Sequence, residues 1–250
     1  MCYNILENVS EETYIFNMSF FAVHAIEGSH YIDRRLSAHL RPDYFLYKIS
    51  PSARLFNSCD LTIEELAAEY AVEIQKKHKP PYLLSAFCAT GFITIEMAKI
   101  LSSKEIPVQG ILWFGPPNSF TETKKRSVLN YWDKTRESRM KDKLDKGLSQ
   151  EQANQKLIIV ENILKALVQY NCPISDRRDI FLFHQSDRTT APHVSNIFDF
   201  NIFDKSSGLM NYLVNAEVVS INGKHGKLGE EPYCSQLAKE VRKVLAQIIK

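Results

Sequence analysis

Residues 81–101 constrain the fold of this chain more than any other stretch of its sequence. A short apolar run at 82–87 breaks on the small residues of 88–91, and a second apolar run at 92–101 follows with the spacing of a buried helix. A strand that turns at once into a helix, with the single cysteine Cys88 at the break, has the layout of a nucleophile elbow. In a parallel sheet such a turn lies at the carboxyl end of a strand, where reactive groups gather.

Apolar residues alternate between strand and helix spacing along the rest of the chain. The predicted strands are 14–23, 44–49, 82–87, 108–114, 179–183 and 216–221, and the predicted helices include 31–40, 60–76, 92–101 and 231–249. Residues 201–215 read as irregular and then helical. This alternation favours an α/β fold with a mainly parallel sheet and helices on both faces.

A charged helical insertion interrupts the alternation. Residues 129–144 are rich in Lys, Arg, Asp and Glu, and Ser149 with Gln152 forms a capping-box pattern before a helix that reaches about residue 170. We therefore predict a single domain, residues 1–250, with a helical insertion at about 118–175.

The composition narrows the class of protein. A formal charge of +2 on 31 basic and 29 acidic residues gives no reason to expect a nucleic-acid partner. The five cysteines are odd in number and form no C-x-x-C pair, so neither a disulfide framework nor a metal site is indicated, and a reducing compartment fits. The acidic start of the chain and the lack of a long apolar run predict a cytoplasmic protein without a membrane span.

A base for Cys88 is predicted on the loop after the last strand. His225 stands between glycines there, at Gly223-Lys224-His225-Gly226, just before the terminal helix. An imidazole beside a thiol at a helix amino terminus favours the thiolate, which is the nucleophile. Asp187, after the strand at 179–183, is the best available acid partner for the imidazole, although an aspartate in that place is also a common turn residue.

Two backbone amides are predicted to form an oxyanion hole. The N–H of Ala89, next to Cys88, would supply one donor. The N–H of Ile26, on the loop after the first strand, would supply the other. Each such donor contributes about 3–4 kcal/mol to a transition state that carries a negative oxygen.

With these parts placed, the sequence resembles the thioesterase domains of non-ribosomal peptide and polyketide synthases, which have the α/β-hydrolase fold. The resemblance runs nearly from end to end. It is carried by residues 20–40, by 61–82 with Ile63-Glu64-Glu65-Leu66-Ala67, by 85–101 with Glu96-Met97-Ala98, and by 218–244 around Gly223-Lys224-His225.

The resemblance implies a thioesterase or acyltransferase. Such an enzyme takes an acyl or peptidyl chain from the phosphopantetheine arm of a carrier protein onto its nucleophile, here Cys88, and releases it by hydrolysis, cyclisation or transfer to an amine. No cofactor of its own is implied. The partner would be an acyl or peptidyl carrier protein, either within a larger synthase or apart from it. Residues 118–173 match the helical lid over the acyl channel.

Three departures separate this sequence from the family pattern. Gly-x-Ser-x-Gly is Ala86-Phe87-Cys88-Ala89-Thr90 here, so cysteine replaces serine and a β-branched Thr90 stands where helix and strand pack closely. The acid position after the strand at 108–114 falls on Gly115. Two other readings stay open: a dienelactone-hydrolase-like ester hydrolase that uses Cys88, and a catalytically silent binding module.

Overall fold

The computed structural model describes residues 19–57, 60–117, 122–172, 175, 177, 179–187, 209 and 212–249. Residues 14–18 of the predicted first strand and most of the segment 201–215 lie outside this range. For Asp187 the structure describes the backbone but not the side chain.

Within the described residues, six parallel strands form one sheet in the order β2-β1-β3-β4-β5-β6. The strands are β1 (Ser19–Val23), β2 (Leu46–Ile49), β3 (Tyr82–Phe87), β4 (Val108–Phe114), β5 (Ile180–Asp187) and β6 (Glu217–Lys224). The turn that follows β3, at residues 88–91, therefore lies at an inner strand, with sheet on both sides of it. The predicted mainly parallel α/β architecture is confirmed.

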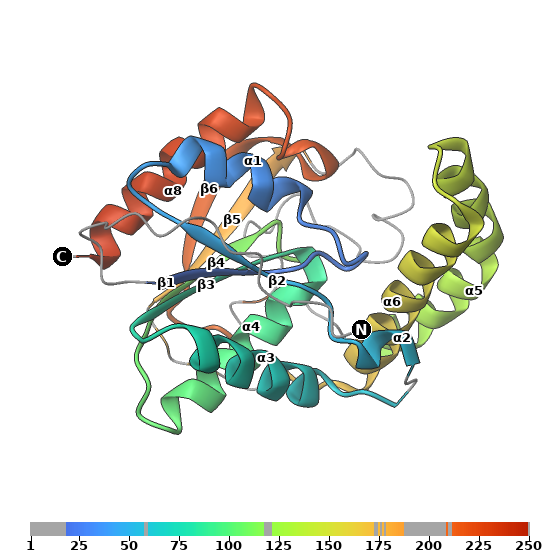
Figure 1. Cartoon of the computed structure of the whole chain (residues 1–250), viewed down its shortest axis with the longest axis horizontal. Coiled ribbons are helices and arrows are strands. Elements are labelled where there is room, and N and C mark those ends of the chain that lie inside the picture. Colours follow the sequence, from blue (N-terminus) through green and yellow to red (C-terminus); the bar gives the residue numbers. More distant parts are fainter. Residues whose placement is uncertain are drawn as a thin grey trace.

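Helices cover both faces of the sheet (Figure 1). They are α1 (Tyr31–Leu40), α2 (Arg54–Asn57), α3 (Ile63–Lys77), α4 (Gly91–Ser102), α5 (Glu122–Asp145), α6 (Gln150–Gln169) and α8 (Tyr233–Ile248). α1 and α8 pack on one face, and α3 and α4 pack on the other. None of the helices in the described ranges is long and apolar enough to span a bilayer.

The sheet divides the core into two layers because successive side chains of a strand point to opposite faces. On β4, Ile111 and Trp113 join the layer under α3 and α4, whereas Leu112 and Phe114 join the layer under α1 and α8. A strand that is buried on both faces is a continuous apolar run in the sequence, and for this reason β3 and β4 could be predicted from the sequence alone.

The segment between β4 and β5 holds α5 and α6, which pack against each other as an antiparallel pair at one side of the molecule (Figure 1). The capping box predicted at Ser149 is present: its hydroxyl accepts from the Gln152 N–H, and the Gln152 side chain accepts from the Ser149 N–H. The same reciprocal cap, between Thr62 and Glu65, begins α3.

Candidate active site

Cys88 stands at a strained turn between β3 and α4. Its φ is +55°, in the left-handed region that residues other than glycine rarely adopt, and it begins the 3-10 turn η1 (Cys88–Thr90). Such strain persists only where the surroundings fix it, and it concentrates at functional sites. The sharp turn predicted at 88–91 is therefore present, with the cysteine at its first residue and 3% exposed.

Helix α4 can pack closely on strand β4 because residue 91 is glycine. Residue 90 is not the position that this close packing requires to be small. A Cβ at Gly91 would lie 1.9 Å from the Trp113 ring of β4, so no larger residue fits there. Thr90 is buried, and its hydroxyl donates to the Phe87 carbonyl across the turn at 2.9 Å. The β-branched residue at position 90 is thus accommodated by a hydrogen bond inside the turn.

His225 lies beside this turn. It follows β6 directly, at the start of the short helical turn η3 (His225–Lys227), and is 4% exposed. Its ring packs against that of Phe87, the residue before Cys88, with 4.6 Å between the ring centroids. Two residues 137 positions apart in sequence, Cys88 and His225, thus belong to neighbouring turns at the same edge of the sheet.

Gly115, at the carboxyl end of β4, takes the place at which related thioesterases are expected to carry the acid. Its φ is +57°, and a Cβ there would lie 2.8 Å from Nδ1 of His225 and 2.6 Å from Nε2 of Gln185. The position thus faces the imidazole, but it has no side chain. Gln185 of β5, which the sequence patterns did not single out, lies there instead.

Asp187, the acid predicted from the sequence, is the last residue of β5. The register of the β5–β6 pair sets it opposite Lys224, next to His225. Its backbone is therefore at the right edge of the sheet, and the role of its side chain stays a prediction.

The loop after β1 is held by a buried histidine. Nδ1 of His24 donates to the Ala25 carbonyl at 2.8 Å, and Nε2 accepts from the Tyr70 hydroxyl at 2.8 Å. The Ser52 N–H in turn donates to the Tyr70 oxygen at 3.0 Å. Burial lowers the pKa of His24 to about 3, so the ring is neutral at physiological pH.

The loop itself folds as a tight turn around the candidate oxyanion donor Ile26. The Gly28 N–H donates to the Ala25 carbonyl, and the Ala25 N–H donates to the Ser29 carbonyl, both at 2.8 Å. Within the described ranges, the Ile26 N–H has no hydrogen-bond acceptor. Ala89 lies at the amino end of the helical segment after β3, where the N–H groups have no acceptor within the helix itself. The oxyanion-hole role of these two backbone amides stays a prediction.

An ion pair joins this loop to the α5–α6 pair. Nζ of Lys143 on α5 lies 2.9 Å from Oε2 of Glu27, the neighbour of Ile26. The Lys143 side chain is 10% exposed and the Glu27 side chain 42% exposed. The long insertion is thereby connected to the loop that carries a candidate oxyanion donor.

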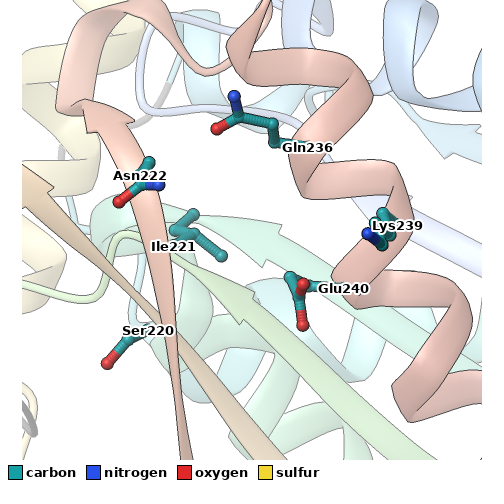
Figure 2. Close-up of a pocket in the computed structure, with 6 residues that line it drawn as sticks. All are labelled: Ser220, Ile221, Asn222, Gln236, Lys239 and Glu240. Atoms are coloured by element: carbon teal, nitrogen blue, oxygen red, sulfur yellow. The ribbon is translucent and has the colours of Figure 1, made fainter.

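A surface pocket of about 200 Å³ lies elsewhere, between β6 and α8. Figure 2 shows its lining side chains on these two elements: Ser220, Ile221, Asn222, Gln236, Lys239 and Glu240. Neither Cys88 nor His225 lines this pocket, so it is not the setting of the candidate nucleophile.

A parallel sheet with a nucleophile turn after an inner strand and a histidine after the last strand defines the α/β-hydrolase class of proteins. The comparisons with known proteins agree with this class. A family model of the thioesterase domain matches residues 19–199, so the chain belongs to the thioesterase domain family. No curated protein sequence matches the chain.

Solved structures share the fold at low sequence identity. The NocB thioesterase domain in covalent complex with a fluorophosphonate nocardicin G analog superposes with a TM-score of 0.67 at 19% identity, covering 91% of this chain and 94% of that one. The Vlm2 thioesterase domain with a bound dodecadepsipeptide gives 0.65 at 16% identity, covering 90% and 97%. The four-domain non-ribosomal peptide synthetase AB3403 gives 0.71 at 19% identity, covering 92% of this chain and 19% of that one.

Proposed function

We propose that this chain is a cysteine-dependent thioesterase that holds an acyl or peptidyl chain on Cys88. Its substrate would be a thioester on the phosphopantetheine arm of a carrier protein. The family membership supports the thioesterase reaction. The observation that supports the choice of nucleophile is the left-handed turn at Cys88, with the His225 ring packed against the adjacent Phe87.

In the first step, His225 takes the proton of the Cys88 thiol, and the thiolate attacks the carbonyl carbon of the carrier thioester. The negative oxygen of the tetrahedral intermediate accepts hydrogen bonds from the N–H groups of Ala89 and Ile26. The carbon–sulfur bond to the carrier then breaks. The pantetheine thiol leaves with the proton from His225, and the acyl group stays on Cys88 as a new thioester.

In the second step, His225 removes a proton from the accepting nucleophile, which attacks the acyl carbon and displaces the Cys88 thiolate. His225 then returns this proton to the Cys88 sulfur, which restores the starting enzyme. The accepting nucleophile can be water, a hydroxyl of the bound acyl or peptidyl group itself, or an amine. A thioester on Cys88 is close in energy to the incoming thioester and reacts with amines more readily than an oxygen ester does. We therefore propose transfer to an amine or cyclisation as an outcome at least as favoured as hydrolysis.

The α5–α6 pair is the proposed lid over the acyl chain. Its sequence position between β4 and β5 supports this role, and so does the ion pair of Lys143 with Glu27 beside a candidate oxyanion donor. The carrier protein would present its arm from outside this lid. An arrangement within a larger synthase and a free-standing enzyme are both compatible with the proposal.

Intact-mass measurement after mixing with an acyl-pantetheine thioester tests the proposal. The parent protein should gain the mass of one acyl group, and Cys88→Ala should gain none. Cys234→Ala serves as the matched control, because Cys234 is also buried but lies on α8, and it should acylate like the parent. A parent protein that forms no adduct under these conditions contradicts the proposal.

Two other outcomes separate the remaining alternatives. Equal or better turnover of small lactones, without a carrier thioester, would favour a carboxyl-ester hydrolase that uses Cys88. Slow alkylation of the Cys88 thiol by iodoacetamide, together with no turnover, would favour a silent binding module. Glycine at position 115, where the acid is expected, is the feature of the sequence that such a module would explain.

A further inference from the structure

We propose that the side-chain amide of Gln185, and not a carboxylate, positions the imidazole of His225. This inference rests on the function proposed above and assigns the third polar group of the site. Gln185 is a positioning residue in this proposal, since it acts on the substrate only through His225.

The amide of Gln185 is buried without a partner. Gln185 is 0% exposed, and neither its Nε2 nor its Oε1 has a hydrogen-bond partner within the part of the chain that the structure describes. An amide left unsatisfied in a protein interior costs about 1–3 kcal/mol, so a buried glutamine of this kind requires a reason. Its surroundings provide one.

Gln185 and His225 meet at the place where Gly115 has no side chain. The point at which a Cβ of residue 115 would stand lies 2.6 Å from the Gln185 amide nitrogen and 2.8 Å from Nδ1 of His225. The two polar groups therefore flank one small space. Because that space belongs to the position where relatives are expected to carry the acid, Gln185 lies where it can replace that acid.

The chemistry of an amide suits this task. If the terminal amide rotates about its last side-chain bond, Oε1 takes the place of Nε2 with no change in the carbon chain, because the two groups are nearly the same size. Nδ1–H of His225 then donates to Oε1, and this hydrogen bond selects the tautomer whose Nε2 has a free lone pair. That lone pair is what Cys88 needs as a base.

A neutral amide also agrees with a cysteine nucleophile. A carboxylate stabilises the imidazolium that forms during catalysis, and an amide orients the ring without adding negative charge. A serine needs that charge more than a cysteine does, because a thiol ionises several pH units below an alcohol and is intrinsically more nucleophilic. Cysteine at position 88 and glutamine at position 185 thus form a consistent pair.

The first test measures the rate at which acyl-pantetheine thioester acylates Cys88, as a function of pH. Gln185→Met keeps the volume but not the hydrogen bond, and should slow acylation by about tenfold, the factor that one lost hydrogen bond represents. Gln185→Glu places a negative charge beside the imidazole and should move the inflection attributed to His225 upward by about one pH unit or more. The upward shift requires that residue 185 faces the imidazole, and slower acylation in Gln185→Met then shows that the amide itself is needed.

Two further variants make the test specific. Tyr82→Phe is the matched control, since Tyr82 is also buried and its hydroxyl donates to the His78 carbonyl, but it stands at the amino end of β3, opposite to the end that carries Cys88, and it should move neither the rate nor the inflection. Asp187→Asn tests the competing acid. If Asp187→Asn slows acylation as much as His225→Gln does, while Gln185→Met leaves the rate unchanged, the proposal is wrong.

The second test does not depend on turnover. Long-range ¹H–¹⁵N spectra of the histidine side chains, with the His225 signals assigned by loss in His225→Gln, report which ring nitrogen carries the proton. We expect Nδ1–H for His225 in the parent and a mixture of tautomers in Gln185→Met. Nε2–H in the parent overturns the assignment of Gln185. A parent with the expected tautomer and no acyl adduct overturns the proposed function alone.

Discussion

The indole N–H of Trp113 donates a hydrogen bond of 2.6 Å to the carbonyl oxygen of Cys88, and so joins β4 to the strained turn after β3. Trp113 is fully buried, and its ring also fills the space that Gly91 leaves open. One side chain thus holds both the backbone of the candidate nucleophile and the first turn of α4. This contact explains how Cys88 can keep a backbone conformation in the left-handed region.

Replacement of Trp113 by Phe should weaken the elbow. The variant lacks the hydrogen bond to the Cys88 carbonyl and part of the ring against Gly91, and we expect a loss of about 2 kcal/mol in the free energy of unfolding. Acylation of Cys88 should slow as well, because the turn is less well fixed. Urea unfolding and the acylation rate measure the two effects, and an unchanged acylation rate in a destabilised protein would show that the hydrogen bond serves stability only.

Replacement of Gly91 by Ala should destabilise the protein although alanine favours helices. The new Cβ would lie 1.9 Å from the Trp113 ring, an overlap that neither β4 nor α4 can relieve, so we expect a net loss of about 2–3 kcal/mol. Gly110→Ala is the matched control, because its Cβ would meet no ring: it would lie 2.9 Å from Cδ1 of Ile248, 3.2 Å from Cδ1 of Leu83 and 3.3 Å from the Asp179 carbonyl oxygen, so we expect a smaller loss there. Gly91→Ala should also cost less in a Trp113→Phe background than in the parent, as thermal unfolding of the four proteins can show.

Stability should fall as the pH falls below about 6.5 because of His24. In the folded protein the pKa of this buried ring is lowered to about 3, whereas in the unfolded chain it has the ordinary value of 6.5. Between these values the unfolded state binds a proton that the folded state does not, so His24 favours folding above pH 6.5 and this contribution is lost toward pH 3. The slope for one proton is about 1.4 kcal/mol per pH unit.

Urea unfolding at pH 7.5, 5.5 and 4.5 measures that slope in the parent and in His24→Gln. The variant should be less stable at pH 7.5, since the hydrogen bonds to Tyr70 and Ala25 change, and its stability should depend less on pH over this range. Equal slopes in the two proteins would mean that His24 is protonated in the folded state.

Removal of the Lys143 side chain should uncouple α5 from the loop around Ile26. Lys143→Ala leaves Glu27 without its partner, and we expect a loss of about 1 kcal/mol in stability together with slower acylation. Lys146→Ala is the matched control just beyond the end of the same helix, because its pair with Asp142 is exposed and should contribute little. Slowing of equal size in both variants would point to the positive charge around the end of α5 and not to this contact.

Much of the fold could be predicted from residue order because local patterns are sufficient for it. The apolar runs of β3 and β4, the capping box at Ser149 and the break at Cys88 depend on neighbours along the chain, and each was predicted. Thr90 was a departure from the family pattern, and its hydrogen bond to Phe87 shows why the turn forms nevertheless.

The sequence by itself determined the class of this protein: a parallel α/β sheet of the thioesterase domain family, with Cys88 at the turn into a helix. Only the tertiary structure decided which groups surround His225, because β5 and β6 reach that edge of the sheet from segments far from Cys88. A buried glutamine such as Gln185 has no sequence pattern that marks it. The proposed role of Gln185 follows from two features of the fold: residue 115 has no side chain, and the Gln185 amide and the His225 imidazole both border the place where that side chain would stand.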